Sequence, residues 1–294
     1  MRTIAHLACR RHSGGLPMLT KPFTAELSGY KGILPTGTVR SDVTTEDYAD
    51  AQEIFQPGKA RGFLLPIIRE APARTLLDVG CGMGGMATAL EEEGYQSYGV
   101  DLPGLERRWA SAGRSPDRFF LVDPDRFALP FVDGSIDFAF TFGVIEHVGT
   151  TDGHADRRPN WHTARRDWLR EIFRVLRPGG RMLVGGPNRG FLLDVAHGPD
   201  SRAAAWELWL TRRLGVTVHR IWGDNFLWAY GDVRRYLDGL PCTIEARSVA
   251  GFLEFSRAPA ALRGLARAYV RHLPRALLGT GFNPWVMALI TRTH

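Results

Sequence analysis

A glycine-rich loop directly after a short apolar run constrains the fold more than any other feature. The run from Thr75 to Val79 is typical of a buried strand, and Gly80, Gly82 and Gly85 follow it with the spacing G-x-G-x-x-G. Folds that bind a nucleotide-like cofactor place such a turn after their first strand, because glycine lets the backbone approach the ligand. The spacing alone is a weak signal, since dinucleotide-binding enzymes share it.

Two acidic residues beside the loop favour a cationic cofactor. Asp78 stands two residues before the first glycine, where its carboxylate would repel a pyrophosphate but attract the ammonium and sulfonium groups of S-adenosylmethionine (SAM). Gly84 extends the run to G-x-G-x-G, and Asp101 ends a second predicted strand, where it can accept both ribose hydroxyls. Leu102 is placed to pack on the adenine. The loop therefore predicts a SAM site in preference to a nicotinamide site.

Strands and helices alternate along the rest of the chain. This alternation predicts an α/β fold with a Rossmann-like parallel sheet, helices on both faces and an antiparallel last strand. After the first strand, strands are predicted at 97–101, 119–122, 136–142, 181–185, 243–249 and 285–291, and helices at 86–93, 161–176, 232–240 and 260–272. A further helical pattern at 45–70 is expected to break near Pro57-Gly58.

An aromatic-rich insertion of about residues 188–230 separates predicted strands five and six. Its aromatic residues are Phe191, Trp206, Trp209, Trp222, Phe226, Trp228 and Tyr230. Aromatic side chains of this kind can line a cover over a substrate or form an accessory core, and both alternatives stay open. Residues 1–45 are predicted to be a flexible N-terminal segment, and residues 46–294 a single domain that carries the insertion.

Taken together, the motifs resemble those of class I SAM-dependent methyltransferases, and particularly the branch with ubiquinone, menaquinone and natural-product enzymes. The resemblance covers about residues 70–187. It rests on 78–85, Asp101, 125–131, 138–148 and 176–180. It implies that SAM is the cofactor and that Asp101 holds its ribose. The loop residues implied to lie around its methionine part are Asp78, Gly80, Cys81, Gly82 and Gly84.

The same resemblance implies contacts elsewhere on the cofactor. Asp125 matches the family's acid for the adenine amino group, with Arg126 and Phe127 beside it, and Phe142 would face the bound cofactor. Gly143 stands where some quinone-pathway relatives carry the first glutamate of a metal-binding triad, so no metal site is predicted.

His147, just past the predicted fourth strand, is the candidate catalytic residue. Methyl transfer is a displacement at a sulfonium, so the protein mainly positions the acceptor. A hydroxyl acceptor also benefits from a general base, and the ordinary pKa of histidine suits that role. Relatives commonly carry a histidine here whatever they methylate, so a structural role stays open. Outside candidates are His162, His197 and His219, and the segment 152–156 is predicted to be a polar loop.

The composition indicates which kinds of partner and which compartment we expect for the protein. The formal net charge is +6, but the arginines are scattered, which makes nucleic acid an unlikely partner and keeps an RNA methyltransferase as an alternative. The three cysteines lie far apart, which fits a reducing cytoplasm, and no apolar run is long enough to span a membrane. We expect a cytoplasmic enzyme that methylates a small apolar or aromatic acceptor, more readily on oxygen than on carbon or nitrogen. A non-catalytic binding module is the other alternative.

Overall fold

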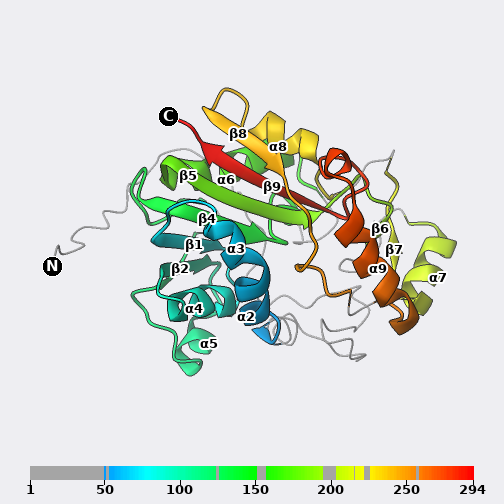
Figure 1. Ribbon diagram of the computed structural model, residues 1–294, viewed down its shortest axis with the longest axis horizontal. Helices are drawn as coiled ribbons and strands as arrows, with labels where there is room; N and C mark the ends of the chain where they lie inside the picture. Colours follow the sequence, from blue (N-terminus) through cyan, green and yellow to red (C-terminus); the bar gives the residue numbers. More distant parts are fainter. Residues whose placement is uncertain are drawn as a thin grey trace.

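A seven-stranded sheet forms the centre of the protein (Figure 1). The computed structural model describes residues 50, 53–123, 126–150, 157–194, 203–214, 216–221, 226–255 and 258–294. The strand order is β3-β2-β1-β4-β5-β9-β8. The strands are β1 (Thr75–Val79), β2 (Gln96–Asp101), β3 (Phe119–Leu121), β4 (Ile136–Phe142), β5 (Leu176–Pro187), β8 (Cys242–Ala246) and β9 (Trp285–Arg292).

Strand direction confirms the predicted architecture. Strands β1 to β5 pair in parallel, whereas β9 runs antiparallel to both of its neighbours, β5 and β8. The carboxyl ends of the parallel strands therefore meet at one edge of the sheet, which is where ligands bind in open α/β sheets. The predicted sixth strand ends at Ala246 rather than at Val249.

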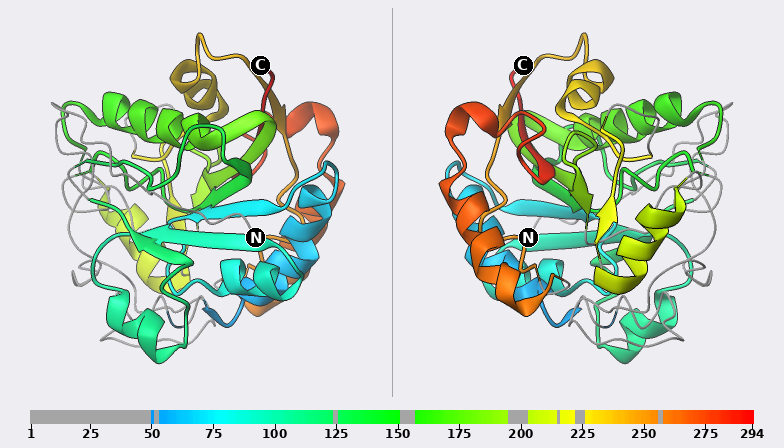
Figure 2. Two further views of the ribbon diagram at one scale, coloured as in Figure 1. Left: turned by 90° about the vertical axis from the view of Figure 1, so that its left-hand side faces the viewer. Right: turned by 90° about the vertical axis from the view of Figure 1, so that its right-hand side faces the viewer.

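Helices cover both faces of the sheet (Figure 2). On one face, α6 (Trp161–Val175) and α8 (Tyr230–Tyr236) enclose an apolar core, because Trp168, Leu169 and Ile172 recur at helical spacing on the buried side of α6. The other face is covered by α4 (Gly85–Glu92), α9 (Ala260–His272) and the helix before β1. A short α5 (Glu106–Ser111) follows β2.

The helix before β1 runs without a break from Gln56 to Ile68. It consists of α2 (Gln56–Lys59), a π-helical stretch η1 (Ala60–Leu64) and α3 (Leu65–Ile68). The predicted break near Pro57 is confirmed, because residue 53 is helical, Ile54 and Phe55 form a turn, and the helix resumes at Gln56. Proline occupies the first turn of α2, where its missing N–H removes no hydrogen bond of the helix.

The insertion after β5 forms a small lobe of its own. It contains β6 (Leu193–Asp194), α7 (Ala205–Leu214) and β7 (Thr217–Val218), and β6 pairs antiparallel with β7. His219 is buried, with Nε2 3.1 Å from Oδ2 of Asp194. Trp228 is buried in the main core, whereas Trp206 and Trp209 are exposed. Trp222 and His197 lie outside the described residues. A 3-10 helix, η2 (Arg275–Leu277), follows α9.

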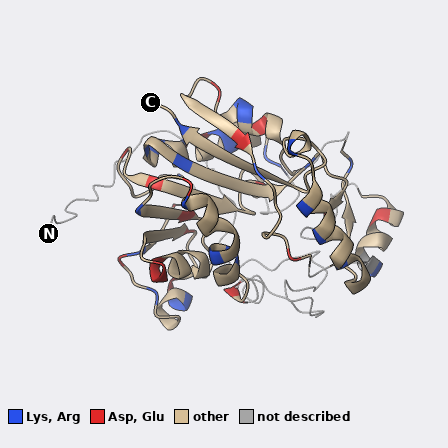
Figure 3. Cartoon of the chain, viewed as in Figure 1, with Lys and Arg blue, Asp and Glu red and all other residues tan. Residues whose placement is uncertain are grey.

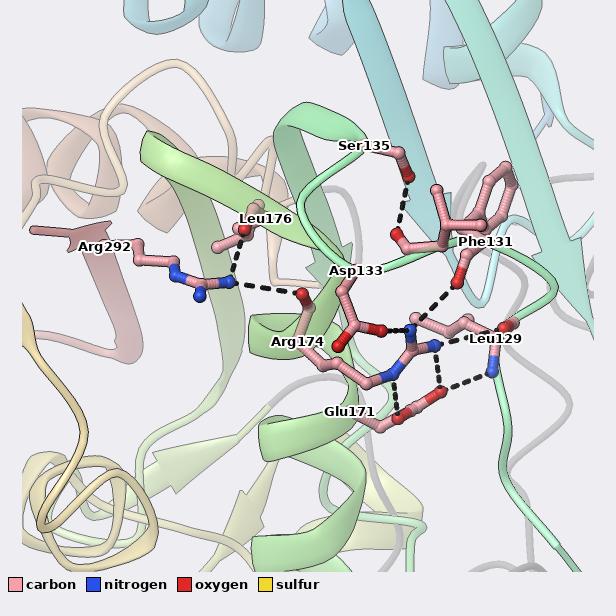
Figure 4. A network of polar contacts seen from close by, with 9 residues as sticks. Leu129, Phe131, Asp133, Ser135, Glu171, Arg174, Leu176 and Arg292 are labelled. Carbon is pink, nitrogen blue, oxygen red and sulfur yellow. Dashed lines mark hydrogen bonds and ion pairs between the residues drawn. The ribbon is translucent and has the colours of Figure 1, made fainter. Parts of the chain in front are cut away.

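Arg174 fastens the segment before β4 to the end of α6 (Figure 4). Its guanidinium donates to the backbone oxygens of Leu129 (3.2 Å) and Phe131 (3.0 Å) and to the carboxylates of Glu171 and Asp133. The Glu171 carboxylate also accepts the Leu129 N–H at 2.7 Å. This network holds the backbone of residues 129–131 and so fixes how the chain enters β4.

Candidate active site

The glycine loop follows β1 and packs against Val144, just after β4, and against Phe119 of β3. Gly80 and Gly84 have φ angles of 79° and 82°, which side-chain-bearing residues rarely adopt. A Cβ at Gly80 would lie 2.4 Å from Cγ2 of Val144, and a Cβ at Gly84 would lie 2.2 Å from Cε1 of Phe119. Gly84 is also the N-cap of α4. Only glycine fits at these two positions.

Asp101 ties the loop to the end of β2. Its Oδ2 accepts the Gly82 N–H at 2.6 Å and its Oδ1 accepts the Leu102 N–H at 2.7 Å. Burial raises the pKa of this carboxyl to about 6 despite the two hydrogen bonds. Each carboxylate oxygen keeps a second lone pair. The ionised Asp101 can thus hold the loop and still accept hydrogen bonds from a ligand's hydroxyls.

Other carboxylates gather around the same loop. Asp78 is buried at the end of β1, and its pKa is raised well above the usual value by burial and by the negative charges of Asp101 and Glu53. Burial also raises the pKa of Glu53, although Arg114 opposes the shift. A cationic ligand would favour the charged forms of these acids. The three carboxylates therefore suit SAM and disfavour a pyrophosphate.

Several residues that the sequence did not indicate cover the loop. Gln56 accepts the Gly85 N–H through Oε1 at 2.8 Å. From the other side, Nε1 of Trp109 donates to the Gly82 oxygen at 2.8 Å, and Nε of Arg114 donates to the Met83 oxygen at 3.0 Å. Of these three residues, only Trp109 could have been suspected from the sequence, because it is the one buried residue of α5, the short helix after Asp101.

The remaining predicted cofactor residues differ in their surroundings. The Cys81 side chain is buried in a small core with Trp109 and Phe119, and burial raises the pKa of its thiol well above normal, so only its backbone remains to meet a ligand. Phe127 packs in the main core, its ring 5.7 Å from that of Trp168. Arg126 is exposed, Leu102 is half-buried, and Asp125 lies outside the described residues.

Phe142 belongs to an aromatic cluster at the carboxyl end of β4. The cluster consists of Phe63, Phe142, Phe252 and Trp285. The Phe252 ring lies 4.6 Å from Phe142, 5.2 Å from Phe63 and 5.3 Å from Trp285. Nζ of Lys59 lies 4.6 Å from the centre of the Phe252 ring, and burial lowers the pKa of the Lys59 ammonium. The cluster is thus a largely buried apolar group, with a lysine against it, at the edge of the sheet where the parallel strands end.

His147 lies in the turn that follows β4. Its N–H donates to the Val144 oxygen at 2.9 Å, and its own oxygen accepts the Thr150 hydroxyl at 2.7 Å. The backbone of the turn is thereby fixed close to Val144, which itself packs on Gly80. The structure brings His147 and the glycine loop to the same edge of the sheet.

Arg165 of α6 clamps this turn, and the sequence analysis missed it. The guanidinium is fully buried and donates to the oxygens of Glu146 (2.6 Å), Val148 (3.0 Å), Leu227 (3.4 Å) and Phe226. Burial lowers its pKa to about 10, which leaves it charged at neutral pH. The sequence did contain a signal for Arg165, because it is an arginine on the side of α6 that otherwise carries apolar residues.

His162, another candidate histidine, lies on α6 and is held in a structural contact. Nδ1 of His162 lies 2.8 Å from the hydroxyl of Tyr236, and burial lowers its pKa to about 4. It is therefore neutral at physiological pH. Among the described residues, no three His, Cys, Asp or Glu side chains converge as metal ligands. The polar segment 152–156 lies outside that part of the chain.

Comparison with known proteins gives consistent matches. A family model described as a methyltransferase domain matches residues 77–184. An uncharacterized methyltransferase of Mycolicibacterium gilvum is 31% identical over 218 residues, 72% of this chain and 71% of that protein. One of Mycobacterium avium is 35% identical over 141 residues, 46% of this chain and 50% of that protein, so the chain spans about half the length of this relative.

Solved structures also resemble the chain. The methyltransferase bound to the Haloferax volcanii Trm112 methyltransferase activator is 17% identical, with a TM-score of 0.45 over 85% of this chain and 97% of that chain.

Proposed function

The chain belongs to the SAM-dependent methyltransferases, and on that premise we propose that it methylates an oxygen of a small apolar or aromatic acceptor. The observation that carries the proposal is the aromatic cluster at the carboxyl end of β4. Aromatic walls with few polar groups suit acceptors that bury apolar area. The half-buried Lys59 supplies a cation above this wall, which favours an acceptor with an ionisable oxygen.

Helix 56–68 places this acceptor wall against the methyl-donor site. Gln56 at its start bonds to Gly85, and Phe63, two turns later, enters the aromatic cluster. We assign the methionine part of SAM to the glycine loop with Asp78, and the ribose to Asp101. Asp125, Arg126 and Phe127 are proposed for the adenine side, and Phe142 for the boundary between donor and acceptor.

In the proposed reaction His147 acts as the general base. SAM, when bound, supplies a methyl group on a sulfonium. The His147 imidazole takes the acceptor's hydroxyl proton as the acceptor oxygen forms its bond to the methyl carbon. The electron pair of the carbon–sulfur bond would stay on sulfur, so the loss of the sulfonium charge would balance the proton that His147 takes up. The cluster positions the acceptor, which is the protein's main contribution to such a displacement.

We further propose that residues 46–294 form one catalytic domain; the predicted N-terminal segment, residues 1–45, lies outside the described residues. The insertion at about 188–230 would cover the bound acceptor. The wide spacing of the cysteines supports a reducing, cytoplasmic location.

The acceptor class is tested by a transfer assay with methyl-labelled SAM. Purified protein is offered phenols, quinols, aliphatic alcohols, sugars and RNA. We expect label on phenolic or quinol oxygens. Transfer only to RNA or sugars would reject the proposed acceptor class, while leaving the family assignment intact.

The acceptor wall is tested by Phe252→Ala, with Phe173→Ala as control. Both side chains are buried, but Phe173 lies on the other face of the sheet, in the core around α6. Phe252→Ala should raise KM for the acceptor about tenfold or more, with S-adenosylhomocysteine affinity unchanged. Equal effects of the two variants on KM would show that the cluster is only core.

The base is tested by His147→Ala, with the exposed His294→Ala as control. We expect a large loss of kcat and a changed pH–rate profile. Wild-type turnover of His147→Ala between pH 6 and 9 would remove His147 from the mechanism.

A further inference from the structure

Helix α9 exposes a stripe of large apolar side chains. Leu262, Leu265 and Tyr269 have relative exposures of 52%, 70% and 39%. Their spacing puts them on one side of the helix. The helix packs on the protein through Val270, its buried residue. We call these three residues the α9 stripe.

The α9 stripe lies at the end of the molecule that also carries the insertion after β5. Most exposed large apolar residues of the described chain lie between residues 192 and 282. They are Leu192, Leu193, Trp206, Trp209, Ile221, Leu262, Leu265, Tyr269 and Phe282. Figure 2 (right) looks onto this end, with α9 and α7 at its two sides. A concentration of apolar surface on one side marks an interaction site.

Contacts join the stripe to the neighbouring loops. The Tyr269 ring lies 6.2 Å from that of Phe191, and its hydroxyl donates to the Phe282 oxygen at 2.6 Å. Gly281 packs on Gly190, just beyond the end of β5. The apolar surface is therefore anchored at the same sheet edge as the glycine loop and the aromatic cluster.

The charged residues of α9 itself are all basic. After Glu254 the sequence contains no Asp or Glu, whereas Arg263, Arg267, Arg271 and Arg275 lie in or beside α9. Figure 3 shows α9 with basic positions and no acidic ones. Arg267, Arg271 and Arg275 are exposed. An anionic partner complements this charge.

The combination of apolar stripe and arginines selects the partner. Nucleic acid would pair with the arginines but would leave Leu262 and Leu265 in water. A bilayer with anionic headgroups satisfies both, as it does for amphipathic helices that lie in the membrane interface. No helix among the described residues has the length and apolarity to cross a bilayer, so contact would be made from the surface.

We propose that α9 docks on an anionic lipid bilayer, with the α9 stripe in the boundary between headgroups and acyl chains. Val270 shares one apolar core with Phe63 and Phe252. Docking therefore brings the aromatic cluster next to the lipid, where an apolar acceptor would be concentrated. Binding to vesicles is measured without acceptor or turnover, so its outcome is independent of the proposed methyl transfer.

Vesicle flotation with the full chain tests the proposal. We expect binding to vesicles of phosphatidylcholine with phosphatidylglycerol, at least about tenfold weaker binding to phosphatidylcholine alone, and loss of binding as salt is raised. Leu262→Asp/Leu265→Asp should weaken binding at least about tenfold. Arg267→Gln/Arg271→Gln should weaken it several-fold, and on the anionic vesicles only.

Matched controls separate this surface from general effects. Val132→Asp changes an exposed apolar residue elsewhere, and Arg166→Gln/Arg234→Gln removes two charges from α6 and α8. All variants are first checked for wild-type thermal stability and S-adenosylhomocysteine affinity. As a second measurement, a polarity-sensitive dye on Leu265→Cys should shift to shorter wavelength with anionic vesicles.

Four results would overturn the proposal. The first is unchanged vesicle binding by the double-aspartate variant, and the second is an unshifted dye on Leu265→Cys. The third is a wild-type dimer that binds no vesicles and becomes monomeric on Leu262→Asp/Leu265→Asp, which would make the stripe a contact between copies of the chain. Salt-sensitive binding to RNA but not to anionic vesicles would also reject a lipid partner.

Discussion

Replacing Arg165 by methionine is expected to release the turn that carries His147. The guanidinium joins the oxygens of Glu146 and Val148, after β4, to those of Phe226 and Leu227, before α8. Methionine keeps much of the apolar stem but donates no hydrogen bond. The backbone oxygens of both segments would then be buried without this donor.

The expected loss of stability is large for one substitution. Removing one partner from a buried charged network costs about 3–5 kcal/mol, and each buried acceptor left without a donor accounts for about 1–3 kcal/mol of such losses. For a domain of this size, the loss corresponds to a fall in Tm of roughly 6–15 °C. The glycine loop and Asp101 do not contact Arg165, so affinity for S-adenosylhomocysteine should stay near the wild-type value while methyl transfer falls.

Urea denaturation and calorimetric titration with S-adenosylhomocysteine measure the two effects. The control is Arg170→Met on the same helix, whose guanidinium donates to the Tyr236 oxygen at 2.8 Å and the Asp238 oxygen at 2.6 Å near the surface. It should cost about 1 kcal/mol. The reasoning is refuted if Arg165→Met stays within 1 kcal/mol of the wild type, or if both variants lose the same stability.

Three further predictions concern the donor site. Since burial raises the pKa of Asp101 from 3.8 to about 6, its contribution to apo-protein stability is fully present below pH 3.8 and is lost as pH rises through 6. Affinity for S-adenosylhomocysteine should change in the opposite sense, falling below pH 6, and Asp101→Asn should flatten both curves in denaturation and calorimetry between pH 4.5 and 7.5. Gly84→Ala should lower the free energy of unfolding by roughly 2–4 kcal/mol in urea denaturation, because backbone strain adds to a clash with Phe119. The control is Gly94→Ala, where φ is 90° but the space is open, and it should cost only about 1 kcal/mol. Equal losses in the two variants would contradict the clash. Trp109→Phe removes the 2.8 Å hydrogen bond to Gly82 and should lower affinity for S-adenosylhomocysteine by about 1 kcal/mol without changing KM for the acceptor; a change confined to that KM would contradict the assignment.

Features that depend on local spacing were predictable from the sequence. The glycine loop, the acid at the end of β2 and the alternation of strands and helices follow from residues close together in the chain, and the structure has them near the expected positions. The break near Pro57 was also predictable, because proline is favoured in the first turn of a helix, and here it follows the turn at Ile54 and Phe55.

The contacts that complete the site were not predictable, because they join distant segments. Gln56 meets Gly85 across 29 residues, and Arg165 reaches Phe226 across 61 residues. Both contacts depend on how the helices pack on the sheet, and the hydrophobic periodicity of the sequence does not specify that packing. The predicted roles of Asp125 and His147 remain predictions, since a bound ligand is needed to test them.

The helix from Gln56 to Ile68 has a kinetic consequence. Because it touches the donor loop at Gln56 and the aromatic wall at Phe63, any movement that admits or releases the donor also displaces the acceptor wall. The acceptor should therefore bind productively only after the donor has seated the helix. Initial-rate studies should show a compulsory order, with the donor first to enter and its demethylated product last to leave.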